Sequence, residues 1–291
     1  MCKTLTVAAE AMATRFEVAI HGAEESILRA AAEEALEEIV RLESILSFFQ
    51  PTSEITNIND HAAREPVTVS PELLTLLLRC RSLHAETGGV FDITVALLMR
   101  CWRFMNDTGA VPTEEAIAAA LACTGMQHVR LDEENCTVSL AKEGMMLDLG
   151  SIGKGYALEQ AAELLVENEF EHFLIHGGTS TVYAHGTQAD GTPWRIAVDH
   201  PDEGEPPLQI IDLESESLSV SGIDGKSFVD DEGTEQGHVI DPRTGRPTQA
   251  ARVAAVICES ATESDAWATA LLVDPTLTPP SHIRVCDQID S

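Results

Sequence analysis

The sequence is poor in basic residues, in aromatic residues and in long apolar runs. Only 18 Lys and Arg stand against 48 Asp and Glu, which gives a formal net charge of -30 over 291 residues. Nucleic acid and anionic lipid attract basic patches, so this balance argues against nonspecific binding to either. No apolar run reaches the roughly 18 residues of a membrane-spanning helix, so membrane insertion is not expected. An anionic small molecule is compatible with the charge, because a metal ion or a helix N-terminus can reverse the local field.

Ordered cysteine spacing and a targeting segment are also lacking. The seven cysteines are odd in number and contain no CxxC pair, which predicts neither a zinc site nor a disulfide framework and favours a reducing compartment. The first 20 residues contain no unbroken apolar stretch typical of a signal peptide. Cys2 directly follows the initiator Met, so it is no lipoprotein site behind a signal. The sequence as written therefore predicts a cytoplasmic protein.

Apolar periodicity predicts a mixed chain of helices and strands. Helical spacing occurs over residues 24–48, 71–89, 113–125, 156–168 and around 265–272, with Thr113 as an N-cap. Strand patterns occur at RFEVAIHG, MMLDLG, FLIHGGTSTVYAHG, PWRIAVDHP and SLSVSG, and HVRLDEENCTVSLA predicts a hairpin. The stretch LSFFQPTSEITNIND is expected to be a loop. No linker or repeat divides the chain, so we predict a single α+β domain over residues 1–291.

The segment MMLDLGSIGKGYALEQAAELL combines glycines and a lysine at the start of a predicted helix. Glycines let the backbone approach a ligand, and a helix N-terminus offers unpaired N–H groups to a phosphate. The segment is not a P-loop, because the spacing from Gly150 to Gly153 and Lys154 is too short and Gly155 replaces the required Ser or Thr. A tight turn with a solvent-exposed lysine explains it equally well.

The segment ESDAWATALLV carries Asp265 and Thr269 four residues apart, which on a helix places them on one face. A carboxylate and a hydroxyl are hard oxygen ligands suited to Mg²⁺. An acidic residue early in a helix and a packing threonine are the commoner explanation of such a pair.

The segment HVIDPRTGRP brings an imidazole, a carboxylate and a guanidinium together around a turn. Pro242 presets φ and Gly245 can adopt a positive φ, as a tight turn requires. A fixed turn of this kind can aim His238 and Asp241 into one pocket. A lone histidine at the end of an apolar strand is more often structural, and the segment alone leaves both interpretations open.

Together these segments resemble the ApbE family, the FAD:protein FMN transferases. Seven pieces occur in the family's order over nearly the whole chain: MATRFEVAI, LSFFQPTSEITNIN, GGVFDITVALL, DLGSIGKGYALEQAAELL, HGGTSTVYAHG, HVIDPRTGRP and ESDAWATAL. The resemblance implies an α+β fold, with a T-fold-like mixed sheet core and flanking helices. It also implies a transferase that uses Mg²⁺ to cleave FAD, releases AMP, and attaches FMN through a phosphoester to a Thr or Ser hydroxyl of a redox acceptor protein.

The resemblance implies roles for individual residues. The metal ligands are Asp265, Thr269 and the backbone carbonyl of Ser151. His238 takes the proton from the acceptor hydroxyl, and Asp241 is a second candidate for that base or orients the histidine. The cofactor-binding residues are Met12, Phe49, Val90, Phe91, Asp92, Lys154, His238 and Ile240. Arg243 is interpreted as structural, because it can brace its own turn.

The chain departs from the family pattern at two site positions. Thr179 follows Gly177 and Gly178 where relatives often have Gly-Gly-Asp, which removes a carboxylate from the pocket. Phe49 replaces a tyrosine, which keeps an aromatic ring but loses its hydroxyl. Many relatives are exported lipoproteins, and no such signal is visible here. Two alternatives use the same site: an FAD pyrophosphatase with water as the acceptor, and a non-catalytic flavin-binding protein.

Overall fold

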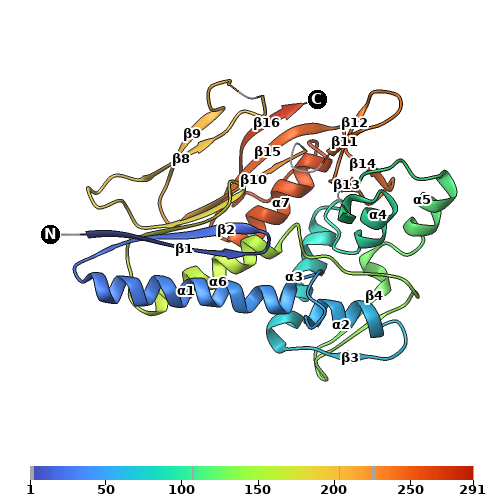
Figure 1. Cartoon of the computed structure of the whole chain (residues 1–291), viewed down its shortest axis with the longest axis horizontal. Coiled ribbons are helices and arrows are strands. Elements are labelled where there is room, and N and C mark those ends of the chain that lie inside the picture. Colours follow the sequence, from blue (N-terminus) through green and yellow to red (C-terminus); the bar gives the residue numbers. More distant parts are fainter. Residues whose placement is uncertain (1–2, 107, 203, 224–226, 291) are drawn as a thin grey trace.

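A seven-stranded antiparallel sheet forms the centre of the molecule (Figure 1). The computed structural model describes residues 3–106, 108–202, 204–223 and 227–290, so Cys2 lies outside the described residues. Across the sheet the strands are β1 (Lys3–Ala11), β2 (Thr14–Gly22), β6 (Phe173–Gly177), β7 (Thr181–His185), β10 (Glu216–Gly222), β15 (Ala251–Cys258) and β16 (Arg284–Asp290). This sheet with its flanking helices confirms the predicted α+β class.

Three helices cover one face of the sheet, namely α1 (Glu25–Leu46), α6 (Gly153–Glu167) and α7 (Ala261–Val273). In α1 the buried residues recur every three or four positions, so one apolar stripe faces the core. α7 is buried on nearly all sides because it lies between the sheet and α6. Within the described residues, no helix has both the length and the apolar composition needed to cross a membrane.

The opposite face of the sheet is covered in part by a hairpin of β8 (Trp194–Val198) and β9 (Gln209–Leu213). Trp194 and Leu213 pack there against Ala184, Leu218 and Ile257 of the central strands. The sheet is therefore covered by helices on one face and in part by this hairpin on the other, and seven of the eight residues of β15 are buried.

A smaller helical region and several short strands lie beside one end of the sheet, at the right of Figure 1. Its helices are α2 (Glu54–His61), α3 (Pro71–Glu86), α4 (Ala96–Cys101), α5 (Glu114–Leu121), η1 (Phe104–Asn106) and η2 (Met126–His128). Its strands are β3 (Val67–Thr68), β4 (Val129–Asp132), β5 (Thr137–Leu140), β11 (Ser227–Val229), β12 (Glu235–Gly237), β13 (Ile240–Asp241) and β14 (Arg246–Pro247). Ile240 packs with Leu98, Trp102 and Ile117 in a separate core, so this core anchors β13 to the helical region.

Most of the predicted elements are confirmed. The five predicted helices correspond to α1, α3, α5, α6 and α7, and the Thr113 side chain accepts a hydrogen bond from Ala116 N as an N-cap. The predicted hairpin is formed by β4 and β5. The glycine break in FLIHGGTSTVYAHG is a turn between the antiparallel strands β6 and β7.

Two predictions about elements are wrong. The expected loop at 46–60 contains α2, which begins after Ser53, whose hydroxyl accepts from Thr56 N at 3.0 Å. The four apolar residues of MMLDLG are buried, but the segment forms no strand. The Leu147 N–H donates to Asn59 Oδ1 at 2.7 Å, and Asn59 Nδ2 donates to the Leu147 carbonyl at 2.9 Å. A side chain therefore satisfies this backbone where a neighbouring strand would otherwise do so.

Candidate functional site

The N-terminus of α6 meets the side of α7 at a hydrogen bond between residues 110 positions apart in the chain. Gly155 N donates to Asp265 Oδ2 at 2.9 Å. A Cβ atom at Gly155 would lie 2.7 Å from the Asp265 Cβ atom and would also collide with the Ala261 carbonyl. Glycine at this position is therefore a requirement of helix packing, and the Ser or Thr that the P-loop pattern has there would not fit.

The three predicted metal ligands lie around this contact. In a regular helix the Gly155 N–H would bond to the Ser151 carbonyl, but here it donates to the carboxylate of Asp265. Among the described residues, no backbone hydrogen bond ends on the Ser151 carbonyl. Thr269 Oγ1 lies 3.3 Å from the Asp265 carbonyl and 3.3 Å from Ser221 Oγ of β10.

This donor set fits Mg²⁺. A carboxylate, a hydroxyl and an uncommitted carbonyl are all hard oxygen ligands, and Mg²⁺ usually keeps further positions for water and phosphate. Asp265 is 4% exposed, so its side chain is largely shielded from water. In the described part of the chain, no group of three His, Cys, Asp or Glu is arranged to hold a metal. A metal at this site would therefore depend on the carbonyl and hydroxyl ligands as well as on one carboxylate.

Lys154 and Asp148 flank the same turn, and the sequence analysis did not identify Asp148. Burial raises the pKa of the Asp148 carboxyl, while the Gly150 N–H and the nearby Lys154 ammonium act in the opposite direction. Asp148 Oδ1 accepts from Gly150 N at 2.9 Å. The aspartate therefore braces the turn that leads into α6. The only signal for this role in the sequence is its position two residues before Gly150.

Met12 occupies a strained turn at one end of the central sheet. Met12 and Ala13 connect β1 to β2 with φ values of 50° and 57°. Two successive positive φ angles suit the twist of a hairpin, but they cost a residue with a Cβ about 1 kcal/mol or more each. Gly178 N donates to the Arg15 carbonyl at 2.9 Å, so the turn at 178–180 lies beside this hairpin.

Thr179, which stands where relatives often have an aspartate, lies in this neighbouring turn, and the Thr179 side chain is exposed. Val220 N of β10 donates to the Ser180 carbonyl at 2.7 Å. The next residue, Ser221, places its Oγ 3.3 Å from Thr269 Oγ1. This end of the sheet therefore gathers Met12, the 178–180 turn and Thr269, although they come from distant parts of the sequence.

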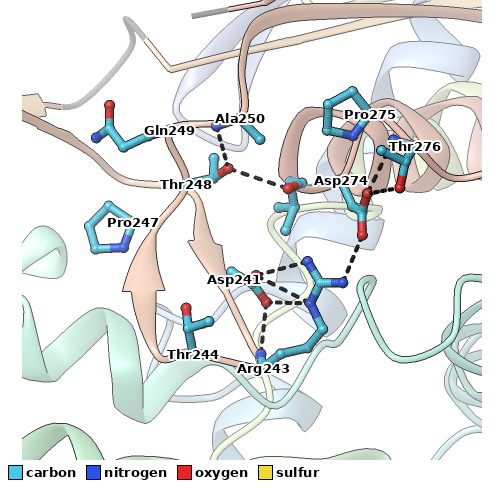
Figure 2. Close-up of a pocket in the computed structure, with 11 residues that line it drawn as sticks. Asp241, Arg243, Thr244, Pro247, Thr248, Gln249, Ala250, Asp274, Pro275 and Thr276 are labelled. Carbon is cyan, nitrogen blue, oxygen red and sulfur yellow. Dashed lines mark hydrogen bonds and ion pairs between the residues drawn. The ribbon is translucent and has the colours of Figure 1, made fainter.

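The turn after His238 has the predicted form (Figure 2). Gly245 N donates to the Asp241 carbonyl at 2.8 Å, and Gly245 has a φ of 71°. Trp102 Nε1 donates to the Gly245 carbonyl at 2.8 Å, which ties the turn to the helical region. The chain just after His238 is held as well, because Thr248 N donates to the Val239 carbonyl at 2.8 Å.

Arg243 braces this turn and reaches α7. Its Nε donates to Asp241 Oδ1 at 2.9 Å and its Nη2 to Asp241 Oδ2 at 2.9 Å, while Nη1 donates to Asp274 Oδ2 at 2.7 Å (Figure 2). The two carboxylates raise the pKa of Arg243 above its ordinary value. Both carboxylate oxygens of Asp241 therefore accept hydrogen bonds from Arg243. His238 is half-buried and lies in the bend between β12 and β13.

A hollow of about 410 Å³ lies beside the turn. It is bordered by Asp241, Arg243 and Thr248 on one side and by Asp274 and its neighbours on the other (Figure 2). Of the two candidate bases, Asp241 lines this hollow, whereas His238 is not among its lining residues.

The remaining residues predicted to bind the cofactor have different surroundings. Phe49 is 70% exposed, and its ring meets Phe48 edge-on at 5.4 Å. Val90 and Phe91 are 4% and 1% exposed and belong to the main hydrophobic core. Ile240 packs in the smaller core of the helical region. Phe49 thus offers an open aromatic surface, while the side chains of the other three are taken up by packing.

Asp92 is a buried carboxylate that organises its own loop. Its Oδ1 accepts from Thr94 N at 2.8 Å and from Thr94 Oγ1 at 2.5 Å, and its Oδ2 lies 3.3 Å from His84 Nδ1. Burial raises the pKa of the Asp92 carboxyl, and the hydrogen bonds from Thr94 oppose this shift. A role for Asp92 at a flavin stays a prediction.

Comparison with known proteins identifies the family. The model of the ApbE family matches residues 12–282. A protein of Klebsiella pneumoniae named FAD:protein FMN transferase is 31% identical over 268 residues, which cover 90% of this chain and 76% of that protein.

Solved structures agree with this match. The crystal structure of the ApbE protein of Thermotoga maritima superposes with a TM-score of 0.85 at 32% identity, and covers 93% of this chain and 87% of that one. The flavin transferase ApbE of Vibrio cholerae superposes with a TM-score of 0.79 at 27% identity, and covers 94% and 87%. The predicted fold and resemblance are thereby confirmed, and the chain belongs to the ApbE family.

Proposed function

We propose that this chain transfers FMN from FAD to a threonine or serine hydroxyl of an acceptor protein. The hydroxyl oxygen attacks the phosphorus of the FMN half, the bond from that phosphorus to the bridging oxygen breaks, and AMP leaves with that oxygen. A phosphoester joins FMN to the acceptor. The main support is the hydrogen bond from Gly155 to Asp265, which brings a buried carboxylate of α7 to the N-terminus of α6. The names of the relatives agree with this reaction.

Ser151, Asp265 and Thr269 would hold Mg²⁺, which neutralises the charge of the diphosphate as its bridging bond breaks. Lys154 in the first turn of α6 adds a positive charge beside the phosphates. The unpaired N–H groups of a helix N-terminus favour the same anion.

His238 accepts the proton of the attacking hydroxyl in this proposal. Asp241 is less suited to that role, because Arg243 and its own turn engage both carboxylate oxygens. Met12 and Phe49 contribute to the flavin or adenine pocket through accessible apolar surface. Val90, Phe91, Asp92 and Ile240 act there by supporting the pocket wall. The acceptor is a redox subunit, and the whole chain works as one catalytic domain in the cytoplasm.

The proposal is tested by mixing the protein with FAD, Mg²⁺ and a threonine-containing acceptor domain from a flavinylated redox protein. Fluorescence on a denaturing gel reports covalent flavin, and AMP is assayed in the same tube. Labelled acceptor with matching AMP is the expected result. AMP and free FMN without label would identify an FAD pyrophosphatase instead. Bound FAD without AMP would identify a flavin-binding protein.

Asp265→Ala tests the metal in the same assay. We expect it to abolish Mg²⁺-dependent turnover while the circular dichroism spectrum stays that of the wild type. Asp212→Ala removes the same charge from an exposed position on β9 and is the control. Normal FAD cleavage by Asp265→Ala would refute the metal assignment.

A further inference from the structure

The helices α6 and α7 each supply a carboxylate to the N-terminus of the other. Asp265 of α7 accepts from Gly155 N at the start of α6. Glu159 of α6 accepts from Thr262 N at 2.8 Å, at the start of α7, and from Ser260 Oγ at 2.6 Å. A carboxylate at a helix N-terminus forms charge-assisted hydrogen bonds and is favoured by the helix dipole. Both contacts therefore stabilise the packing of α6 against α7.

The spacing of these contacts fixes how the helices meet. Gly155 and Glu159 are four residues apart on α6, and Thr262 and Asp265 are three apart on α7, so each pair lies on one face of its helix. One of these contacts by itself would fix only a single point between α6 and α7. Two contacts, about one helical turn apart, define both the separation and the register of the helices.

The capping residue of α7 is part of the same arrangement. Ser260 Oγ accepts from Glu263 N at 3.1 Å as the N-cap, and it donates to Glu159 Oε2. The beginning of α7 is thus held by its own cap and by a carboxylate from α6. Glu159 is the residue that joins the two.

We propose that Glu159 is a positioning residue for the metal site. It holds α7 so that the Asp265 carboxylate reaches the Gly155 N–H at the start of α6. None of the described hydrogen bonds of Glu159 is with a predicted metal ligand. This inference rests on the proposed function for its chemistry. Loss of Glu159 leaves the ligands present but less well aligned. Metal affinity then falls, while the rate at saturating metal is kept.

The experiment measures metal binding without turnover. Mn²⁺ replaces Mg²⁺, and electron paramagnetic resonance measures the concentration of free Mn²⁺ and hence its dissociation constant. ADP is added because it supplies a diphosphate but has no flavin to transfer. Glu159→Ala is expected to raise the dissociation constant for Mn²⁺ about tenfold, which is about 1.4 kcal/mol and lies within the range for losing a side-chain acceptor at a helix N-terminus. Glu159→Gln keeps an oxygen acceptor and should restore most of the affinity. If Glu159→Ala does not fold, Glu159→Asp, with its shorter side chain, takes its place with a smaller expected loss.

A second measurement separates positioning from catalysis. At saturating Mg²⁺ the transfer rate of Glu159→Ala should return to within about twofold of the wild type, because Glu159 acts only through alignment of the ligands. Glu163→Ala, one turn further along α6, removes the same charge from an exposed residue that bonds to Gln160. This control should leave Mn²⁺ affinity unchanged.

The inference is overturned if Glu159→Ala binds Mn²⁺ as tightly as Glu163→Ala. It is also overturned if only the saturating rate falls, or if Asp265→Asn leaves Mn²⁺ affinity unchanged, because then the metal lies elsewhere. A wild-type protein that binds Mn²⁺ through Asp265 but labels no acceptor would refute the proposed function alone. The two failures are therefore distinguishable.

Discussion

Gly155 is the residue at which helix packing and the candidate site meet. Its N–H serves Asp265, and its missing side chain lets the Ala261 carbonyl approach. Alanine is the better helix former by roughly 0.5–1 kcal/mol, so propensity alone would favour Gly155→Ala. The collision with α7 outweighs this gain, since overpacking a dense contact typically costs about 1–3 kcal/mol.

We therefore expect Gly155→Ala to lower the free energy of unfolding by about 1 kcal/mol, near the middle of the range of about 0–2.5 kcal/mol that remains when the gain in propensity is subtracted from the overpacking cost. Urea denaturation measures the change. Gly153→Ala, in the same turn, is the control. Its added Cβ would meet only Leu149 Cβ at 3.9 Å, an ordinary contact. Equal effects of the two substitutions would contradict the packing argument.

His238 and Asp241 give different expectations for the proton acceptor. His238→Ala should lower the transfer rate by about a hundredfold or more, the usual contribution of a general base, while FAD binding is retained. Asp241→Ala should keep the rate within about tenfold of the wild type, because that carboxylate braces Arg243 and the turn. Single-turnover transfer and FAD titration separate rate from binding. A larger loss of rate in Asp241→Ala would reverse the assignment.

At the scale of elements, α7 needs polar contacts to fix its rotation. The helix is buried on nearly every side, so burial alone gives little preference for one face. Ser264 is fully buried and lies 2.9 Å from Ser217 Oγ and 2.8 Å from Ser219 Oγ, both on β10. These hydroxyls set which side of α7 faces the sheet, and hence where the adjacent Asp265 points.

Ser264→Ala should lower the free energy of unfolding by about 1–3 kcal/mol, because it leaves the buried Ser219 hydroxyl without the partner described for it. Removing both partners is expected to cost less than the sum of the single changes, since no hydroxyl is then stranded. A double-mutant cycle of Ser219→Ala and Ser264→Ala, followed by urea denaturation, measures the coupling. Strict additivity would mean that this hydrogen bond contributes nothing.

Sequence periodicity predicted the long helices well because their apolar residues repeat at helical spacing over several turns. It missed α2, whose eight residues carry only two buried apolar side chains, Ile55 and Ile58. It also assigned a strand to MMLDLG. Continuous burial gives the same apolar run in a strand and in an irregular segment, and only the Asn59 side chain in the folded protein distinguishes them.

At the scale of the whole molecule, the net charge of -30 has to be reconciled with an anionic substrate. In the proposed function FAD would bring a diphosphate to a chain that carries 48 Asp and Glu. Local positive potential can come from Lys154 and the N-terminus of α6, and from Mg²⁺ if it binds as proposed. A site at a helix N-terminus would therefore suit an anion although the chain as a whole repels anions.

A group of histidines lies near the ends of the strands remote from the Met12 turn. His21 stacks on Trp194 with ring centroids 5.0 Å apart, and His185 stacks on Phe173 at 5.1 Å. Burial lowers the pKa of both histidines below the ordinary value of 6.5, and the neighbouring His172 lowers them further, while Glu171 opposes the shift at His185. The folded state thus favours the neutral rings.

A lowered folded-state pKa means that the stability contribution is complete above about pH 6.5 and is lost as the pH falls below it. The wild type should therefore lose more stability between pH 7.5 and 5.5 than a variant carrying His21→Gln and His185→Gln. The difference in melting temperature between the wild type and the variant is measured across this pH range. Groups that titrate in both proteins affect both melting temperatures equally and cancel in the difference. His61→Gln, an exposed histidine at the end of α2, should follow the wild type. Parallel curves for wild type and double variant would exclude the linkage.

The sequence by itself determined the long helices, most of the strands, the tight turn after Asp241 and the family. These features depend on periodicity, capping residues and turn residues that act within a few positions. Only the tertiary structure decided that Gly155 meets Asp265, that Glu159 reaches Thr262, that Arg243 joins Asp241 to Asp274, and that Val90 and Phe91 lie in the core. Those contacts join residues distant in the chain or depend on which face of an element is covered. They are fixed by the way the helices pack on the sheet and on one another, which no local pattern encodes.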